Sequence, residues 1–450
     1  MAKRTTLYVC QQCGTSFSKW SGKCDNCGAW NSLVEEAKQL EKKAVVDRSV
    51  GRTLVGEKIA EVRTEAMGTR LGTGFDQLDE VLGGGLMPGG VALLAGQPGI
   101  GKSTLLLQLV LAVGVKEPVL YVSGEESAGQ VKLRAERLSK KPSENVTLIA
   151  TTSADDIAAT IASGTYRLVI VDSMQTMAMA EVASAPGTVS QITNSANIII
   201  RAAKASNTAV VLVGHVTKEG SIAGPKVLEH LVDVVLQFEG DRYGGFKLLR
   251  AAKNRYGSTA EVAILEMAGE GLKEVENASA SLLSERGKSD GSVVLATMEG
   301  NRPLLVEIQA LVNPTHFGYP KRTASGFDLN RLTLLIAVLE KRTKLNLSDK
   351  DIFINVVGGL KLVDPAADLA VCMAIASAAA ERTLADDLVV FGEVGLGGEV
   401  RRVGNVELRV KEAKKLGFKR AIAPASKEGG AFVSSIADLR DALNSYLTKK

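Results

Sequence analysis

Short apolar runs alternate with longer amphipathic or apolar segments through the middle of the chain. The short runs have the length of buried strands, and the longer segments have the length and spacing of helices. The predicted strands are Val91–Ala95, Val119–Val122, Arg167–Asp172 and Val210–His215, and the predicted helices include Leu105–Ala112 and Ala128–Leu138. This alternation predicts an α/β domain in which helices cover both faces of a parallel sheet.

The pattern changes after Gly291. Two apolar runs, Ser292–Thr297 and Leu304–Val312, flank a turn signal at Gly300–Pro303 and predict two strands. Three further elements are predicted: a helix with one face formed by Leu329, Leu332, Leu335, Ile336 and Leu339, a small-residue helix at Ala366–Ala380, and a strand–turn–strand at Phe391–Gly404. The carboxyl-terminal third is therefore expected to be an α+β domain.

Four of the five cysteines form two Cys-x-x-Cys pairs near the amino terminus: Cys10, Cys13, Cys24 and Cys27. Four thiolates at this spacing can converge on one structural Zn²⁺, and a disulfide pair is the weaker alternative in a reducing compartment. Trp20 and Trp30 are the only tryptophans, and we expect them to form a small core around the metal rather than exposed partner contacts. The fifth cysteine, Cys372, is expected to be a buried core residue.

Length and composition set further limits. A chain of 450 residues is expected to form two or three domains. The net charge of +4 permits a polyanion partner without proving one, and an aromatic content of 4% argues against broad base-stacking platforms. No apolar run reaches the roughly 18 residues of a membrane span, and residues 1–6 lack the apolar core of a signal peptide. A cytoplasmic protein without a membrane partner is expected.

The segment Gly96–Thr104 reads Gly-Gln-Pro-Gly-Ile-Gly-Lys-Ser-Thr and lies between a predicted strand and a predicted helix, which is the context of a phosphate-binding loop. Its glycines let backbone N–H groups point at phosphate oxygens, and the helix N-terminus adds positive charge. Lys102 is expected to reach the β- and γ-phosphates and Ser103 to hold Mg²⁺. The candidate nucleotide contacts are Gly96, Gln97, Pro98, Gly99, Ile100, Gly101, Lys102, Ser103 and Thr104.

Carboxylates follow two of the predicted strands. Because strand ends line the ligand crevice of a parallel sheet, Asp172 is expected beside the phosphate loop as a Mg²⁺ ligand. Glu125 and Glu126 follow the neighbouring strand, and either is suited to orienting an attacking water, with Glu125 favoured. His215 is expected either to sense the γ-phosphate or to have a structural role.

Two loop-like stretches, Gln175–Gln191 and Thr217–Lys226, also follow strand ends on this side of the sheet. Functional loops gather at that edge, although flexible solvent loops are an equal alternative.

Together these motifs resemble the bacterial RadA (Sms) family of RecA-related DNA-repair ATPases across essentially the whole chain. The zinc ribbon, the Leu71–Gly74 lead-in, the phosphate loop and the Gly124–Glu126 strand end all match the family. Most specific is Lys253-Asn-Arg-Tyr-Gly257, which is similar to the family's Lys-Asn-Arg-Phe-Gly motif with Tyr256 in place of Phe.

The resemblance implies a homo-hexameric ring with ATP and Mg²⁺ at subunit interfaces. Lys253 and Arg255 would then reach the γ-phosphate of a neighbouring subunit, whereas without the family they would be a solvated basic turn. Gln175–Gln191 and Thr217–Lys226 would correspond to the DNA-binding loops of RecA-type rings, with a sequence-independent grip on single-stranded and branched DNA.

The carboxyl-terminal third resembles the proteolytic domain of Lon. A Lon-type protease needs a serine activated by a lysine, but the stretch Leu362–Ala370 has no serine and Glu407 occupies the lysine position. The domain is therefore expected to be a proteolytically inactive scaffold for assembly and DNA binding. Either a basic DNA-binding face or ordinary solvated helix charges are expected from Arg401, Arg402, Arg409, Lys411, Lys414 and Lys415.

The sequence thus predicts four parts: a zinc ribbon at 1–34, a linker at 35–63, a RecA-like ATPase domain at 64–275 and a Lon-protease-like domain at 285–450. The leading hypothesis is a DNA-dependent ATPase motor that drives branch migration of recombination intermediates with the RecA recombinase, in the cytoplasm at the nucleoid. An ATP-dependent protein remodeller and a non-motor ATP switch of the clock-ATPase type are the alternatives.

Overall fold

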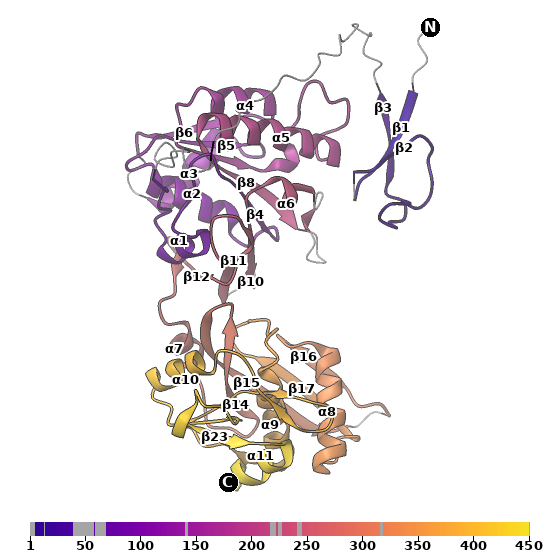
Figure 1. The fold of residues 1–450 in the computed structure, drawn as a ribbon, viewed down its shortest axis with the longest axis vertical. Coiled ribbons are helices and arrows are strands. Elements are labelled where there is room, and N and C mark those ends of the chain that lie inside the picture. Colours follow the sequence, from indigo (N-terminus) through magenta and orange to yellow (C-terminus); the bar gives the residue numbers. More distant parts are fainter. Residues whose placement is uncertain are drawn as a thin grey trace. The chain divides into compact units, whose positions relative to one another are not determined.

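Figure 1 shows the fold in the computed structural model, which describes residues 5–12, 14–38, 58, 69–139, 143–216, 222–223, 227–240, 245–315 and 318–449. The chain divides into two compact units. One comprises Met1–Arg242 and Lys247–Glu274, and the other comprises Tyr243–Phe246 and Val275–Lys450. The four-part division expected from the sequence is finer and stays a prediction.

The amino-terminal module is a small antiparallel sheet in the order β2-β1-β3. Its strands are β1 (Thr5–Cys10), β2 (Ser16–Phe17) and β3 (Leu33–Lys38). The core contains the buried Cys10, Cys24 and Leu33, with Tyr8 and Phe17 packed against them. The expectation that the tryptophans fill this core is wrong: Trp20 is 58% exposed and Trp30 is 73% exposed. The cysteines leave too little interior space for two indole rings in so small a module.

A ten-stranded sheet forms the middle of the larger unit, in the order β13-β12-β11-β10-β4-β8-β7-β5-β6, with β9 paired to β8. The strands from β10 to β6 in this order run parallel, which confirms the predicted parallel sheet. The strand bounds are β4 (Val91–Gly96), β5 (Val119–Ser123), β6 (Val146–Ala150), β7 (Leu168–Asp172), β8 (Ala209–Val216), β9 (Ile222–Ala223), β10 (Val234–Gly240), β11 (Phe246–Asn254), β12 (Val262–Ala268) and β13 (Gly271–Glu274).

Helices cover both faces of this sheet. In β4, Ala92 and Leu94 join a core cluster on one face, whereas Val91 and Leu93 join a cluster on the other. The first cluster contains residues of α1, α2 and α3, and the second contains residues of α4, α5 and α6. Because β4 is buried on both sides, its sequence is continuously apolar. The helix bounds are α1 (Asp76–Leu82), α2 (Lys102–Val113), α3 (Ala128–Leu138), α4 (Ala154–Ala162), α5 (Val189–Ser206) and α6 (Val227–Leu231).

The carboxyl-terminal unit contains a seven-stranded mixed sheet in the order β16-β17-β15-β14-β19-β22-β23. The strands are β14 (Ser292–Glu299), β15 (Arg302–Pro314), β16 (Arg322–Ser325), β17 (Lys350–Val356), β18 (Arg382–Thr383), β19 (Leu388–Val390), β20 (Glu393–Val394), β21 (Val400–Arg401), β22 (Arg420–Pro424), β23 (Val433–Ile436) and β24 (Thr448–Lys449). The helices are α7 (Ala278–Leu283), α8 (Leu329–Thr343), α9 (Ala367–Ala380), α10 (Val406–Lys415) and α11 (Leu439–Tyr446). The α+β character expected for this part is therefore confirmed.

The two predicted helices of this unit are present. In α8, the expected apolar face is buried except at its first residue, Leu329, which is 48% exposed. The small-residue helix is α9, and Cys372 lies fully buried within it, as expected.

A buried ion pair holds α10 against the sheet and the segment before α9. Arg409 is only 2% exposed, and its guanidinium lies 2.7 Å from Asp364 Oδ2. It also donates to the carbonyl oxygen of Ala296 at 2.6 Å, while Asp364 accepts from the amide of Met298 at 3.0 Å. Arg409 therefore does not belong to an exposed basic face. The sequence pattern could not reveal this, because it does not show which charged residue of a helix meets a buried carboxylate. The other five expected basic residues are exposed: Arg401, Arg402, Lys411, Lys414 and Lys415.

We predict that Arg409→Ala lowers the free energy of unfolding of the carboxyl-terminal unit by about 3–5 kcal/mol, because it leaves Asp364 buried without its cation. Urea unfolding followed by hydrogen–deuterium exchange in β14 and α9 measures this loss. The matched control, Arg402→Ala, removes an exposed guanidinium and should change stability by less than about 0.5 kcal/mol. Equal stability of both variants would contradict a structural role for the pair.

Candidate functional site

The predicted phosphate-binding loop joins the central strand β4 to the N-terminus of α2. Gly101 caps the helix with a φ of 114°, a conformation that residues with a Cβ rarely adopt. At the start of the loop, a Cβ on Gly96 would lie 2.7 Å from the carbonyl oxygen of Phe238 on β10. These two glycines allow the backbone to turn tightly between the strand and the helix. The first N–H groups of α2 are thereby left available for an anion.

Lys102 is a buried cation at the start of α2. The residue is 5% exposed, and its Nζ donates to the carbonyl oxygens of Gly96 at 2.7 Å and Gln97 at 3.1 Å. Burial lowers the pKa of Lys102 to about 8, while the nearby carboxylates of Asp172 and Glu125 raise it. A desolvated ammonium beside exposed helix N–H groups is a site suited to phosphate oxygens.

Asp172 lies at the carboxyl end of β7, on the same edge of the sheet as the phosphate loop. Parallel pairing places it next to Ser123 of β5, and Gly96 of β4 lies beside His215 of β8. Tyr121 of β5 donates its hydroxyl to Asp172 Oδ2 at 2.6 Å. Burial raises the pKa of Tyr121 well above its usual value, with the negative charge of Asp172 adding to the effect. The phenol therefore stays protonated and fixes the orientation of this carboxylate.

The two adjacent glutamates after β5 have different surroundings. Glu125 Oε1 accepts a hydrogen bond of 2.6 Å from Ser173, the residue after Asp172, and its charge acts on Lys102. Glu126 instead forms an ion pair with Arg134 of α3. The geometry thus brings Glu125 to the edge that carries Lys102 and Asp172 and directs Glu126 toward a helix. This arrangement supports Glu125 over Glu126 as the residue that would position water.

Lys253 and Arg255 lie at the opposite edge of the same sheet. Asn254 of β11 pairs with Val234 of β10, which in turn pairs with Ala92 near the amino end of β4. The phosphate loop begins at Gly96, four residues further along β4, which is about 13 Å of strand. Neither cation lies beside the phosphate loop of the same chain.

Both cations are held by groups near the end of α6. Lys253 Nζ donates to three carbonyl oxygens, those of Glu229 at 2.8 Å, His230 at 3.3 Å and Val232 at 2.7 Å. Arg255 Nη1 lies 3.1 Å from Asp233 Oδ1, and Asp233 is 2% exposed. Partial burial and the charge of Arg255 lower the pKa of Lys253. The motif is therefore an ordered cationic cluster rather than a freely solvated turn.

The segments after β7 and β8 were expected to be loops. In the first, the expectation is wrong for its last three residues, because α5 begins at Val189. Gln191 is 2% exposed, and its side-chain Nε2 donates to the carbonyl oxygens of Val182 at 2.8 Å and Ser184 at 2.9 Å. Of Thr217–Lys226, the structure describes only the short strand β9, and the side chain of His215 also lies outside the described residues.

Three polar residues that organise these edges were not singled out from the sequence: Tyr121, Ser173 and Asp233. Ser173 and Asp233 each adjoin an apolar strand, so a polar residue at a strand boundary was an available signal. Tyr121 lies inside an apolar strand, and its partner is 51 residues away. Nothing in the linear pattern indicates that contact.

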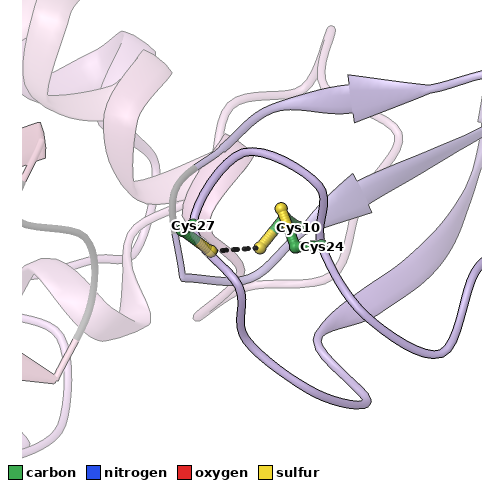
Figure 2. Close-up of side chains that lie close together, drawn as sticks. All are labelled: Cys10, Cys24 and Cys27. Atoms are coloured by element: carbon green, nitrogen blue, oxygen red, sulfur yellow. Dashed lines mark hydrogen bonds between the residues drawn. The ribbon is translucent and has the colours of Figure 1, made fainter.

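The cysteines of the amino-terminal module form a candidate metal centre. Figure 2 shows Cys10, Cys24 and Cys27 gathered at one point, with their sulfur atoms within 4.8 Å of one another. Cys10 Sγ and Cys27 Sγ are 3.6 Å apart, close to the roughly 3.8 Å edge of a tetrahedron with Zn–S bonds of about 2.3 Å. Cys13 lies outside the described residues, so its place as the fourth ligand stays a prediction. A cluster of thiols with two buried members fits Zn²⁺.

Family models match three regions of the chain. A model described as an AAA domain matches residues 60–221, which include the phosphate loop, Glu125 and Asp172. A model of the rubredoxin metal binding domain matches residues 8–35, which include the cysteine cluster, and the module is a zinc ribbon. A model of subunit ChlI of Mg-chelatase matches residues 333–427 of the carboxyl-terminal unit.

Full-length relatives share nearly half of their residues with the chain. A protein named DNA repair protein RadA from Pseudomonas aeruginosa is 48% identical over 98% of both chains. The protein of the same name from Bacillus subtilis is 47% identical over 99% of this chain and 100% of its own. The solved RadB recombinase aligns with 46% of this chain and 100% of its own at 22% identity, with a TM-score of 0.36. Within the described residues, no helix has the length and hydrophobicity needed to span a membrane.

We predict that Cys24→Ser lowers the bound zinc from about one ion per chain to near zero, because a buried thiolate ligand is lost. Metal analysis of the purified full-length chain measures this content. The matched control is Cys372→Ser, which changes a buried cysteine of α9 and should leave the zinc content unchanged. Retention of zinc in Cys24→Ser would contradict the assigned ligand set.

Proposed function

Since the chain belongs to the RadA family of DNA repair proteins, we propose that it is a DNA-dependent ATPase motor that promotes branch migration of recombination intermediates with the RecA recombinase. The observation that carries this proposal is the division of reactive groups between two edges of one sheet. Lys102, Glu125 and Asp172 lie at the edge with the phosphate loop, and Lys253 and Arg255 lie at the other. Such a subunit needs a neighbour to complete its site.

The residues at the carboxyl edge fit ATP and Mg²⁺. Lys102 would exchange its two carbonyl partners for the β- and γ-phosphate oxygens, which offset its charge better than peptide dipoles do. The hydroxyl of Ser103 and the carboxylate of Asp172 supply the oxygen ligands that Mg²⁺ prefers. The bound metal would neutralise charge on the phosphates, and Tyr121 would keep Asp172 turned toward it. The loop residues from Gly96 to Thr104 would form the phosphate cradle.

Glu125 would orient the water that attacks the γ-phosphate. Its hydrogen bond from Ser173 holds it beside Asp172, where the metal and phosphate would lie. Glu125 would accept a proton from this water as its oxygen bonds to the γ-phosphorus, while the bond from phosphorus to the bridging oxygen breaks and ADP leaves. Lys102 would stabilise the charge that develops on the transferred phosphoryl group.

Lys253 and Arg255 would act on the nucleotide of the next subunit in a homo-hexameric ring. A head-to-tail interface joins two different surfaces of neighbouring subunits, and here it would bring the amino edge of one sheet toward the carboxyl edge of the next. Lys253 would leave its carbonyl partners and place its ammonium on the neighbour's γ-phosphate, as an arginine finger does.

Single-stranded and branched DNA would be held by the segments at 175–191 and 217–226 through sequence-independent backbone contacts. The first of these directly follows Asp172 and Ser173, so contact with DNA there would act close to the catalytic carboxylates. His215, whose backbone pairs with Gly96, would relay the state of the γ-phosphate to the second segment. A protein of this kind works in the cytoplasm at the nucleoid.

The Lon-like part would serve as an assembly scaffold rather than a protease. The segment that would carry a nucleophile has no serine, and Asp364 in it is occupied by Arg409. Glu407, at the position where a lysine base would be needed, lies in the first turn of α10 and is exposed. No residue pair in the described part of this segment offers the amine-activated nucleophile that Lon-type proteolysis requires.

The proposed motor is tested by ATP hydrolysis with and without single-stranded DNA. We predict that DNA raises the rate for the wild type, whereas Lys102→Ala loses at least about 100-fold in both conditions because its phosphate contact is missing. A casein digestion assay run in parallel should show no proteolysis. A rate of ATP hydrolysis that does not change with DNA would indicate the non-motor switch. Casein cleavage would indicate the protein-directed alternative. Either result would overturn the proposal.

A mixing experiment tests whether the site is shared. We predict that Lys102→Ala and Lys253→Ala are each inactive alone, and that mixed rings regain up to about a quarter of the wild-type rate. In such rings, some interfaces combine an intact Lys102 with an intact Lys253 from the neighbour. The matched control is Lys273→Ala, an exposed lysine of β13 that should keep full activity. Mixed rings that stay inactive would refute action across the interface.

A further inference from the structure

The two tryptophans of the chain form an exposed pair on the zinc ribbon. Trp20 precedes the second cysteine knuckle, formed by Cys24 and Cys27, and Trp30 follows it. Both side chains face solvent, at 58% and 73% exposure. The knuckle between them is fixed by backbone hydrogen bonds from Gly28 to Cys24 and from Cys24 to Ala29, each 2.8 Å long.

The indole rings lie on either side of Gly22. A Cβ built on Gly22 would be 3.9 Å from Trp20 Cη2 and 3.9 Å from Trp30 Cζ3, so the edges of both rings approach the same point. The amide of Asn31 donates to the carbonyl oxygen of Gly22 at 2.8 Å, and Lys23 pairs with Trp30 across the hairpin. The two arms that carry the rings are thus joined by backbone bonds. The pair is a preformed feature of the hairpin.

Folding does not explain these rings. The interior of the module consists of Cys10, Cys24 and Leu33 with Tyr8 and Phe17 against them, and neither tryptophan contributes to it. A tryptophan offers about 150–250 Å² of surface for burial, the largest contribution of any side chain. Exposed aromatic residues of this size, placed next to each other, are typical of binding sites.

The surroundings of the rings favour a flat, negatively charged ligand. Lys19 and Lys23 are exposed beside them, and Lys23 Nζ lies 5.8 Å from the centre of the Trp30 ring. Among the described residues of the module, Val34 is the only other exposed large hydrophobic side chain. Protein-binding patches are depleted in lysine, whereas two exposed lysines flank this aromatic pair. Small residues and lysines next to two flat rings instead suit a base attached to a phosphate.

We propose that Trp20 and Trp30 form a stacking platform for nucleobases of single-stranded DNA, with Lys19 and Lys23 contacting the adjacent phosphates. The proposal rests on the proposed function, in that it adds a second contact point for the same DNA outside the ATPase core. The platform holds one or two bases and gives no sequence preference, since every base presents a flat face to an indole ring.

The protein provides its own probe for this site. Because both tryptophans lie in the ribbon, all tryptophan fluorescence of the full chain comes from it. We predict that single-stranded oligo-dT quenches this fluorescence, and that an oligonucleotide of the same length with abasic sugars does not. Trp20→Ala and Trp30→Ala should each weaken oligo-dT binding by about 5- to 100-fold, as expected for one lost base stack.

The matched control is Val34→Ala, which changes an exposed apolar side chain on β3 of the ribbon and should bind as the wild type does. Zinc content identifies any variant whose ribbon fails to fold, and Trp30→Phe, which keeps a ring, should restore most of the affinity. Three outcomes would each overturn the platform: equal quenching by the abasic strand, unchanged affinity for oligo-dT in both alanine variants, or quenching by RecA but not by DNA. If one of these results is found while DNA still stimulates ATP hydrolysis, only the stacking platform is refuted. If DNA does not stimulate ATP hydrolysis, the proposed motor is refuted as well.

Discussion

The parallel direction of β4, β8, β7 and β5 determines where the reactive groups of the ten-stranded sheet lie. Parallel strands end at the same edge, so Gly96, Ser123 and Asp172 come together although they are far apart in the chain. The antiparallel hairpin of β10 and β11 then returns the chain to the amino edge and leaves Lys253 there. One sheet therefore presents a phosphate-binding edge and a cationic edge. The distance between them follows from strand length alone, and no local rearrangement within one subunit removes it.

Polar contacts between side chains give each edge its geometry. At the carboxyl edge, Tyr121 orients Asp172 and Ser173 orients Glu125. At the amino edge, Asp233 accepts from the amide of Val91 at 3.1 Å and from Arg255, which connects the cationic motif to the first residue of the central strand. Asp233 is buried and would be costly without its partners, and the hydrogen bonds at the other edge hold Asp172 and Glu125 in place before any ligand arrives.

Local patterns in the sequence predict the parallel sheet, the phosphate loop and the cysteine cluster, because each depends on neighbouring residues or on short fixed spacings. The sequence does not predict contacts between distant segments. Arg409 has the spacing of an ordinary exposed helix residue, yet it meets Asp364 from 45 positions earlier in the chain and is buried. Trp20 and Trp30 are residue types that usually fill a core, but Cys10, Cys24 and Leu33, with Tyr8 and Phe17 against them, already form the interior. In both cases, tertiary packing determines whether the side chain is buried or exposed, and the residue type alone does not predict it.

The close approach of β10 to the phosphate loop has a mechanical consequence. The carbonyl of Phe238 lies against Gly96, and Val234, at the other end of the same strand, pairs with Asn254 next to Lys253. The part of β10 from Val234 to Phe238 is thus a beam about 13 Å long between the two edges, with one register shift at Val235 and Leu236. In a ring of such subunits, a displacement at one nucleotide would travel along this beam to the next. In the proposed ring, this β-hairpin would therefore couple one nucleotide site to the next.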